Sequence, residues 1–421
     1  MTTPDDSEAS EVALRPLVHW LLFETAPNAT AVELLQGFAE QLCGIGLDLL
    51  RIVVQARPLS PHASTQLYVW RPAERAMELS PLVRIVESED HALDATWVQV
   101  VSLAHGAFQT AAFRASPFQL VMLTGGQEVR RRLAVGQTEF EFPILRDLHA
   151  QGVTDYIAFP LAFYGSAPSA VSFATRKLGG YSELDVSVLR AACQPLVLAL
   201  SARLEAHAKR SLLGAYLGAK TADRVLAGAV QRGDVEEIEA AIWFSDLRGF
   251  TPMSAGIPSA ELIAWLNDYF AAVGRAIVGH DGEILKFIGD AILAVWPVSE
   301  ARPREATCRA ALAAAKSANA ELDALNAARE AAGLPAMQHG IGLHVGKAQY
   351  GNIGAEGRLD FTVIGPAVNT ASRLEGAAAK LARRVIASAD FARCVADAVL
   401  PLGTIDLKGF TDAQAIFGIA E

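Results

Sequence analysis

Stretches with helical spacing of apolar residues alternate along the chain with short strand-like apolar runs, and together they predict an α+β fold. Apolar residues recur at helical spacing over 14–40, with a break expected near Pro27-Asn28, and again over 183–212. Short runs of apolar and β-branched residues between these helices predict strands. The runs are LDLLRIVVQARPL, TQLYVW, WVQVV, FQLVML, YIAFPLAF and SAVSFAT. The first half is therefore predicted to be a sheet framed by helices, an organisation common in sensor domains.

The pattern changes from Glu239 onward. IEAAIWFSD predicts a strand, 259–280 an amphipathic helix, and GEILKFIGDAILAVWPV a hairpin that turns at Gly289-Asp290. A long helix follows, then strands in HGIGLHVGKAQYGNIG and LDFTVIG, a helix from PAVNT, and further strands in RRVIAS and the C-terminal tail. The predicted organisation is a disordered tail (1–13), an N-terminal domain (14–200), a helical linker (201–235) and a C-terminal domain (236–421).

Helix start and break signals occur near the helical linker. Ser182 is expected to cap the helix that leads into it, and Pro195 to kink or break that helix. Apolar positions at Leu204, Ala208, Leu212 and Ala215 are compatible with a coiled coil formed with a second copy, and equally with a helix packed on its own domain.

Composition narrows the class of protein. A chain of 421 residues predicts two domains and a connector, and a formal net charge of -10 argues against a nucleic-acid partner. The four cysteines are far apart and form no CxxC pair, so they are expected to be small buried residues in a reducing compartment. The N-terminus lacks a signal-peptide pattern, and LVHWLLF is too short to span a bilayer. These features predict a cytoplasmic protein without a membrane span.

Two carboxylates are placed where chemistry is possible. Asp246 ends a predicted strand in FSDLRGFT, and Asp290 lies at the tip of the predicted hairpin. Strands of one sheet can bring such positions together, and paired carboxylates suit Mg²⁺ or Mn²⁺. The turn after Asp246 contains Gly249 and leads into a helix, so its N–H groups could bind phosphate. Taken singly, each aspartate is also an ordinary turn residue.

Four motifs in order, FSDLRGFT, LKFIGDAIL, DFTVIGPAVNTASRLE and LKGF, resemble those of the class III nucleotidyl cyclases over about 236–421. The resemblance implies a ferredoxin-like, palm-like domain that pairs head to tail in a homodimer, with active sites at the interface. It also implies that Asp246, Asp290 and the Leu247 carbonyl hold two Mg²⁺ or Mn²⁺ ions per site. The triphosphate of ATP would lie along the turn that contains Gly249, Phe250 and Thr251.

The same resemblance assigns the remaining site residues. Lys286 and Thr362 match the two base-reading positions, and lysine with threonine points to adenine and to the subgroup that includes bicarbonate-responsive enzymes. Asn369 matches the residue that orients the ribose, Arg373 the one that stabilises the transition state, and Lys408 the one that grips the terminal phosphates. The implied reaction converts ATP to 3′,5′-cyclic AMP and pyrophosphate. Guanylate cyclase and a non-catalytic nucleotide-binding signalling protein are the alternatives.

Structural roles are also open for these residues. Asn369 could be a plain polar residue near a helix start, Arg373 could pair with Glu375, Lys408 could lie idle in a turn, and Thr362 could be an ordinary strand residue.

The N-terminal half carries a second resemblance. YIAFPLAF and SAVSFATRKLGGYSELDVSVLRAACQPLVLAL are similar to the end of a GAF domain, over about 14–200. This resemblance implies a regulatory domain with a small-molecule ligand, and a ligand-free dimerisation scaffold is the alternative. LLGAYLGAKTADRVLAG is similar to helical connectors that precede cyclase domains. The isolated residues His62, His105 and His149 do not indicate a haem site.

Overall fold

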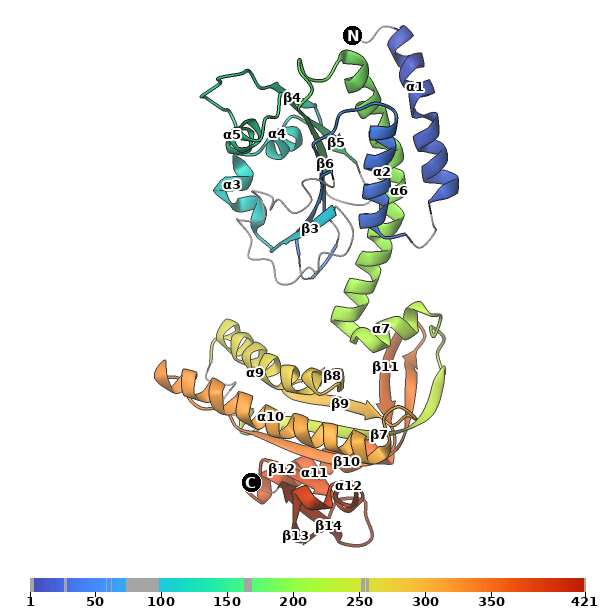
Figure 1. Cartoon of the computed structure of the whole chain (residues 1–421). Helices are drawn as coiled ribbons and strands as arrows, with labels where there is room; N and C mark the ends of the chain where they lie inside the picture. The colour runs from blue at the N-terminus through green and yellow to red at the C-terminus, as the bar shows by residue number, and fades with distance from the viewer. Residues whose placement is uncertain are drawn as a thin grey trace. The chain divides into compact units, whose positions relative to one another are not determined.

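The computed structural model describes residues 4–25, 29–57, 59–61, 63–72, 98–162, 169–250, 254 and 257–419. The chain forms two compact units, residues 1–212 and 213–421, each with its own sheet (Figure 1). Each unit is described by itself below.

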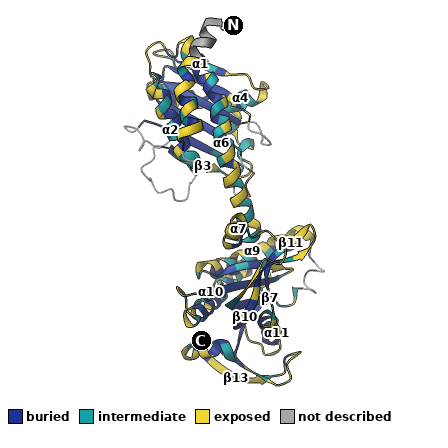
Figure 2. Ribbon diagram, turned by 90° about the vertical axis from the view of Figure 1, so that its right-hand side faces the viewer, coloured by how far each residue is buried: buried dark blue, intermediate teal, exposed yellow. Residues whose placement is uncertain are grey.

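The N-terminal unit is built on an antiparallel sheet in the order β3-β2-β1-β6-β5-β4. The strands are β1 (Arg51–Ala56), β2 (Thr65–Trp70), β3 (Val98–Leu103), β4 (Val129–Arg132), β5 (Asp155–Leu161) and β6 (Ser169–Thr175). Most of their residues are buried, and β1 and β6 are buried along their whole length (Figure 2). The central strands are therefore covered on both faces, which explains their nearly continuous apolar runs.

Helices cover both faces of this sheet. α1 (Pro4–His19), α2 (Ala31–Gly44) and α6 (Glu183–Leu217) pack on one face through a core that includes Leu17, Phe38 and Leu189. α4 (Pro117–Leu123) and α5 (Pro143–Ala150) contribute to a separate core. Short turns of helix complete the unit: the π-helix η1 (Trp20–Glu24), the 3₁₀-helix η4 (Ala107–Gln109) and α3 (Ala111–Arg114). The ring nitrogens of His105 and His149 are hydrogen-bonded to backbone carbonyls, and His62 lies outside the described residues.

Three expectations for this half differ from the structure. FQLVML was expected to be a strand and is the helix α4, because Ser116 accepts a hydrogen bond from Gln119 N–H and Pro117 occupies the first helical position. Helix α1 begins at Pro4, within the expected disordered tail. Helix α6 continues across Pro195 without a break. Its predicted start is confirmed, since Ser182 Oγ accepts from Asp185 N–H at 3.1 Å.

By length and composition alone, α6 is the one described helix that could cross a membrane. Of its most apolar stretch, 44% is buried in the structure, and the core helix of a soluble domain passes the same test. Leu189, Leu196 and Leu200 of this helix belong to the main core of the N-terminal unit. The cytoplasmic location stays a prediction.

The C-terminal unit has a mixed sheet in the order β13-β14-β12-β10-β7-β9-β8, with β11 paired to β10. Its strands are β7 (Val235–Leu247), β8 (Glu283–Ile288), β9 (Ala291–Pro297), β10 (His339–Ala355), β11 (Arg358–Ile364), β12 (Val385–Ser388), β13 (Val399–Ile405) and β14 (Gln414–Ile419). β10 and β12 are parallel, and the other pairs are antiparallel. The predicted hairpin at Gly289-Asp290 is confirmed.

Two helices cover one face of this sheet and a third covers the other (Figure 1). α9 (Ser259–Gly279) and α10 (Arg304–Ala331) pack against Trp243 and Trp296, whereas α11 (Pro366–Lys380) packs over Ala240 and Ile242. α7 (Ala219–Leu226) and α12 (Ala389–Cys394) are short, and a 3₁₀ turn, η5 (Ala396–Ala398), follows α12. Three of the cysteines are at least partly buried as expected, but Cys43 is exposed, so the prediction is wrong for Cys43.

Candidate active site

The two aspartates singled out in the sequence come together in the C-terminal unit. Asp246 is the penultimate residue of β7, and Asp290 follows β8 in the hairpin turn. β7 pairs with β9, with Ser245 opposite Ile292, so the end of β7 and the hairpin turn meet at one edge of the sheet. Gly289 adopts a positive φ of 65°, which a side chain would disfavour, and this lets the turn close.

Burial and charge repulsion both act on Asp246 of this acidic pair. Burial, the hydrogen bond with Asp290 and the negative charges of Asp290 and Glu375 raise the pKa of Asp246 to about 7. Burial also raises the pKa of Glu375 to about 7, although nearby Arg248 opposes the shift. The Asp246 carboxylate accepts a hydrogen bond from Leu247 N–H at 3.1 Å. Three carboxyl groups therefore gather at a site where ionising all of them is unfavourable unless a cation is present.

The donor set fits a hard divalent cation. Mg²⁺ in proteins is usually held by one or two carboxylates, with water and substrate phosphates completing its shell. The aspartate pair supplies the two carboxylates. No group of three or more His, Cys, Asp or Glu residues with metal-binding geometry occurs within the described ranges. Binding at this pair would thus depend on oxygens from the backbone, from water and from a phosphate-bearing ligand.

A second group surrounds Lys286. Lys286 lies on β8, and its ammonium forms an ion pair with Asp360 of β11. Thr362 is two residues beyond Asp360, so both side chains lie on the same face of β11. Thr362 is buried, whereas Asp360 is partly exposed. Lys286 is thus paired with a carboxylate that the sequence reasoning did not single out, and this carboxylate shares a strand face with Thr362.

The third group is on α11 and the turn before β14. Asn369 is exposed and Arg373 half-buried, one helical turn apart. The Arg373 guanidinium lies 5.7 Å from the centre of the Phe410 ring. A Cβ built on Gly409 would lie 3.2 Å from Arg373 Nη2. Arg373 is therefore held against the turn that also carries the exposed residue Lys408.

Close packing fixes the helix that presents these side chains. A Cβ at Gly342 of β10 would lie 2.1 Å from the carbonyl oxygen of Ala371. Only glycine permits this approach, because the obstructing atom belongs to the helix backbone. Gly342 thus sets the depth of α11 on the sheet. Gly340 of the same strand leaves room for the Glu375 carboxyl group, whose Oε1 would be 2.6 Å from a Cβ at that position.

The predicted phosphate turn is only partly described. Leu247 is buried at the end of β7, Gly249 has a positive φ of 69°, and Phe250 packs against the core under α9 and α10. Thr251 lies outside the described residues. Arg248 donates to the carbonyl oxygens of Ala378 and Arg383 and so ties the turn to the end of α11.

Sequence reasoning missed two acidic residues of the site, Asp360 and Glu375. A signal for Asp360 was available: it lies two residues before Thr362 in a strand, the spacing that places side chains on one face. Glu375 is two residues after Arg373, and only the packing of α11 on Gly340 reveals its proximity to the acidic pair. Among the described residues, no hydrogen bond or ion pair joins the acidic pair to the Lys286 group.

Comparison with known proteins shows which family and which proteins the C-terminal unit is similar to. Residues 234–416 match the family model of the adenylate and guanylate cyclase catalytic domain. Adenylate cyclase 1 of Rhizobium meliloti is 38% identical over 185 residues, 43% of this chain and 27% of that protein. An adenylate cyclase of Anabaena cylindrica is 39% identical over 151 residues, 35% of this chain and 29% of that protein. The crystal structure of the adenylyl cyclase CyaB from P. aeruginosa is 26% identical, covers 44% of this chain and 96% of its own, and has a TM-score of 0.41.

The C-terminal unit therefore contains a class III adenylate and guanylate cyclase catalytic domain, with adenylate cyclases among its relatives. The matched stretch spans less than a third of either curated relative.

Proposed function

We propose that the chain is an adenylate cyclase that converts ATP to 3′,5′-cyclic AMP and pyrophosphate at the interface of a homodimer. The observation that carries the proposal is the convergence of Asp246 and Asp290, with the pKa of Asp246 raised to about 7 by burial and by its acidic neighbours. Such a pair is suited to cations that accompany a triphosphate. When bound, two Mg²⁺ or Mn²⁺ ions would neutralise the triphosphate and acidify the ribose 3′-hydroxyl.

Base recognition is assigned to Lys286 and Thr362. The ammonium of Lys286 can only donate, which suits N1 of adenine and not the protonated N1 of guanine. The Thr362 hydroxyl can accept from the 6-amino group of adenine. Asp360 holds the Lys286 ammonium in place when no nucleotide is bound. These residue types favour ATP, and guanylate cyclase activity is the alternative.

Transition-state stabilisation is assigned to α11 and the turn beside it. Arg373 would donate to the phosphoryl oxygens that gain charge as the 3′-hydroxyl attacks, Asn369 would orient the ribose, and Lys408 would bind the terminal phosphates. The contact of Arg373 with Phe410 restricts the guanidinium before substrate arrives. A donor held in advance lowers the barrier more than one that must be ordered during the reaction.

A homodimer is proposed because exposed apolar side chains follow Lys286 at the end of β8. Phe287 is 53% exposed and Ile288 48% exposed, next to a residue assigned to base reading. Adjacent large apolar side chains at a functional edge favour cover by another chain. In the proposed pair, Asp246 and Asp290 of one subunit face Lys286, Thr362, Asn369 and Arg373 of the other.

The N-terminal unit is proposed to be a GAF-like regulatory domain. Support comes from its six-stranded antiparallel sheet covered by helices on both faces, and from α6, whose residues reach both compact units. A difference in specific cyclase rate between the full chain and residues 201–421 would be expected, and equal rates would contradict a regulatory role.

The decisive experiment is a chromatographic assay of cyclic nucleotide formed by the full chain with Mn²⁺ and either ATP or GTP. We expect cyclic AMP, and loss of about 10²- to 10³-fold in kcat for Arg373→Ala, the size seen when a preorganised donor is removed. Lys286→Glu should shift the preference towards GTP. No cyclic nucleotide from either substrate would favour a non-catalytic binding protein.

A further inference from the structure

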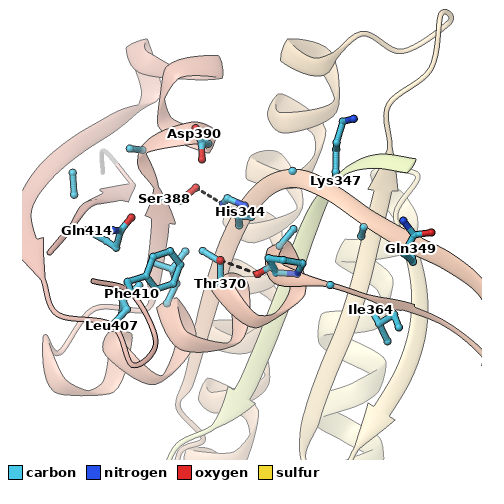
Figure 3. Close-up of a pocket in the computed structure, with 18 of the residues that line it drawn as sticks. His344, Lys347, Gln349, Ile364, Thr370, Ser388, Asp390, Leu407, Phe410 and Gln414 are labelled. Carbon is cyan, nitrogen blue, oxygen red and sulfur yellow. Dashed lines mark hydrogen bonds between the residues drawn. The ribbon is translucent and has the colours of Figure 1, made fainter. Parts of the chain in front are cut away.

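A pocket of about 490 Å³ lies beside α11 in the C-terminal unit, and none of the residues assigned to catalysis lines it. It is bounded by β10, by the first turn of α11, by the start of α12 and by the turn around Phe410 (Figure 3). Thr370 and Leu374 of α11 face it, each one residue beyond Asn369 or Arg373. The pocket has the size of a small-molecule site.

His344 and Ser388 are buried polar residues in the wall of this pocket. His344 is 8% exposed, and its Nδ1 lies 2.8 Å from Ser388 Oγ. Ser388 Oγ already accepts from Phe391 N–H at 3.2 Å, so its own proton is available for Nδ1. This arrangement leaves the ring proton on Nε2, for which no partner is found among the described residues. Burial lowers the pKa of His344 to about 4, so the ring is a neutral donor.

The open side of the ring faces space that a glycine keeps free. A Cβ built on Gly346 would lie 2.9 Å from His344 Nε2 and 3.2 Å from Ala367 Cβ. Ala367 is in the first turn of α11, where Gly365 offers no side-chain cap and Pro366 has no N–H. Two kinds of donor, an imidazole N–H and uncapped helix N–H groups, therefore border one small volume.

The remaining wall is divided between paired charges and apolar groups. Lys347 pairs with Glu237 at 2.7 Å and Asp390 pairs with Arg393, so these charges are compensated within the protein. Leu374, Leu407 and Phe410 provide an apolar surface. An occupant with an accepting head and a flat apolar body matches both parts.

We propose that this pocket is a second ligand site, which binds a small carboxylate through His344 Nε2–H and the first turn of α11 and packs its apolar body against Leu407 and Phe410. The head of such a ligand accepts hydrogen bonds, and the N-terminus of α11 favours its negative charge. A neutral amide of the same shape places a donor where the site also donates, so it binds more weakly.

A ligand bound in this pocket is expected to change the cyclase rate, and this half of the inference rests on the proposed function. Phe410 touches both the pocket and Arg373, and Leu407 precedes Lys408 in the same turn. A ligand against these residues would fix the turn and the rotamer of Arg373. The pocket is thus an effector site placed behind the catalytic helix.

The test uses the full chain with benzoate and its neutral isostere benzamide, titrated by ligand-observed NMR and calorimetry. We expect saturable binding of benzoate and at least tenfold weaker binding of benzamide. His344→Asn keeps an acceptor for Ser388 and removes the Nε2 donor, so it should weaken benzoate at least tenfold. Ala415→Trp, at an exposed position of the rim, should block binding without touching the core.

His280→Asn is the matched control, because His280 also pairs with a serine, Ser317, at 2.9 Å, but not in this pocket. It should leave benzoate affinity unchanged. The proposed site would be wrong if benzoate and benzamide bound with equal affinity, or if neither pocket variant changed the affinity for benzoate. A cyclase rate that stays constant while benzoate saturates the chain would overturn the effector role. Absence of any cyclase activity would refute the proposed function and leave the binding result intact.

Discussion

Lys286 of β8 and Asp360 of β11 form an ion pair, and it joins two strands that do not neighbour each other in the sheet order. Both side chains are partly exposed, so the pair adds little to stability. Its effect is on geometry: the carboxylate directs the lysine ammonium towards the strand face that also carries Thr362. In the proposed function, Asp360 is therefore a positioning residue for base recognition.

Replacing Asp360 by Asn should impair substrate selection more than folding. Without the carboxylate, the Lys286 ammonium samples more rotamers, so KM for ATP should rise several-fold and the ratio of kcat/KM for ATP over GTP should fall. Steady-state kinetics with both nucleotides measure these effects. Glu356→Gln, an exposed charge change on the same β10–β11 hairpin, is the control and should leave both values near those of the original chain. An unaltered ATP-to-GTP ratio in the Asp360 variant would rule out this role.

The acidic pair is expected to support metal binding while lowering the stability of the metal-free protein. Asp290→Asn removes a charge that raises the pKa of Asp246. The metal-free variant should melt at the same temperature as the original or higher, because like charges no longer meet. It should also lose the stabilisation given by millimolar Mn²⁺ and at least 100-fold in cyclase rate.

Thermal melts with and without Mn²⁺ measure both changes. The exposed residue Asp268 offers the control variant Asp268→Asn, which should retain the Mn²⁺ shift. A full Mn²⁺ shift in Asp290→Asn would contradict a metal site at this pair.

The sequence allowed most of the C-terminal unit to be predicted, because its strands and helices differ in period and are bounded by clear turn residues. FSDLRGFT and LKFIGDAIL located two strand ends, and their convergence required only that both strands belong to one sheet. The error at FQLVML shows the limit: a short apolar run fits a strand or a helix, and the Ser116-Pro117 start signal decided it. Glu375 was missed because its importance depends on which elements pack together, and local pattern does not reveal that. For Asp360, the spacing to Thr362 predicts a shared strand face, but the ion pair with Lys286 depends on how β8 and β11 meet in the fold.

Buried Glu283 ties α7 to the β8–β9 hairpin, and this predicts a measurable coupling between them. It is 5% exposed and accepts hydrogen bonds from Thr221 Oγ1 of α7 at 2.8 Å and from Tyr350 of β10 at 3.0 Å. Thr221→Val deprives a buried carboxylate of one donor, which should cost about 1–3 kcal/mol in the free energy of unfolding. It should also lower cyclase rate, since Glu283 begins the strand that carries Lys286.

Urea unfolding and the cyclase assay test this coupling together. Thr404→Val, at an exposed position of β13, is the matched control and should change the free energy of unfolding by less than about 0.5 kcal/mol. A Thr221 variant as stable as the control would show that the hydrogen bond does not anchor α7.

Two buried histidines of β10 predict how stability depends on pH. Burial lowers the pKa of His339 to about 3 and that of His344 to about 4, from 6.5. Between pH 4 and 6.5 both rings are protonated in the unfolded chain and neutral in the folded one. The unfolded state then binds more protons, so the free energy of unfolding falls as pH is lowered through this window. Each histidine should contribute on the order of 3 kcal/mol to this loss by pH 4.

Carboxylates also titrate in this range, so the comparison must be between variants. His344→Asn removes one of the two histidines that take up a proton on unfolding. The free energy of unfolding of the original chain minus that of the variant should therefore fall by about 1.4 kcal/mol for each unit by which the pH is lowered from 6.5 to 4. Urea unfolding at half-unit pH steps measures this slope. If the His344 difference did not vary with pH, the ring would already be charged in the folded state, and the neutral donor assigned to it would be wrong.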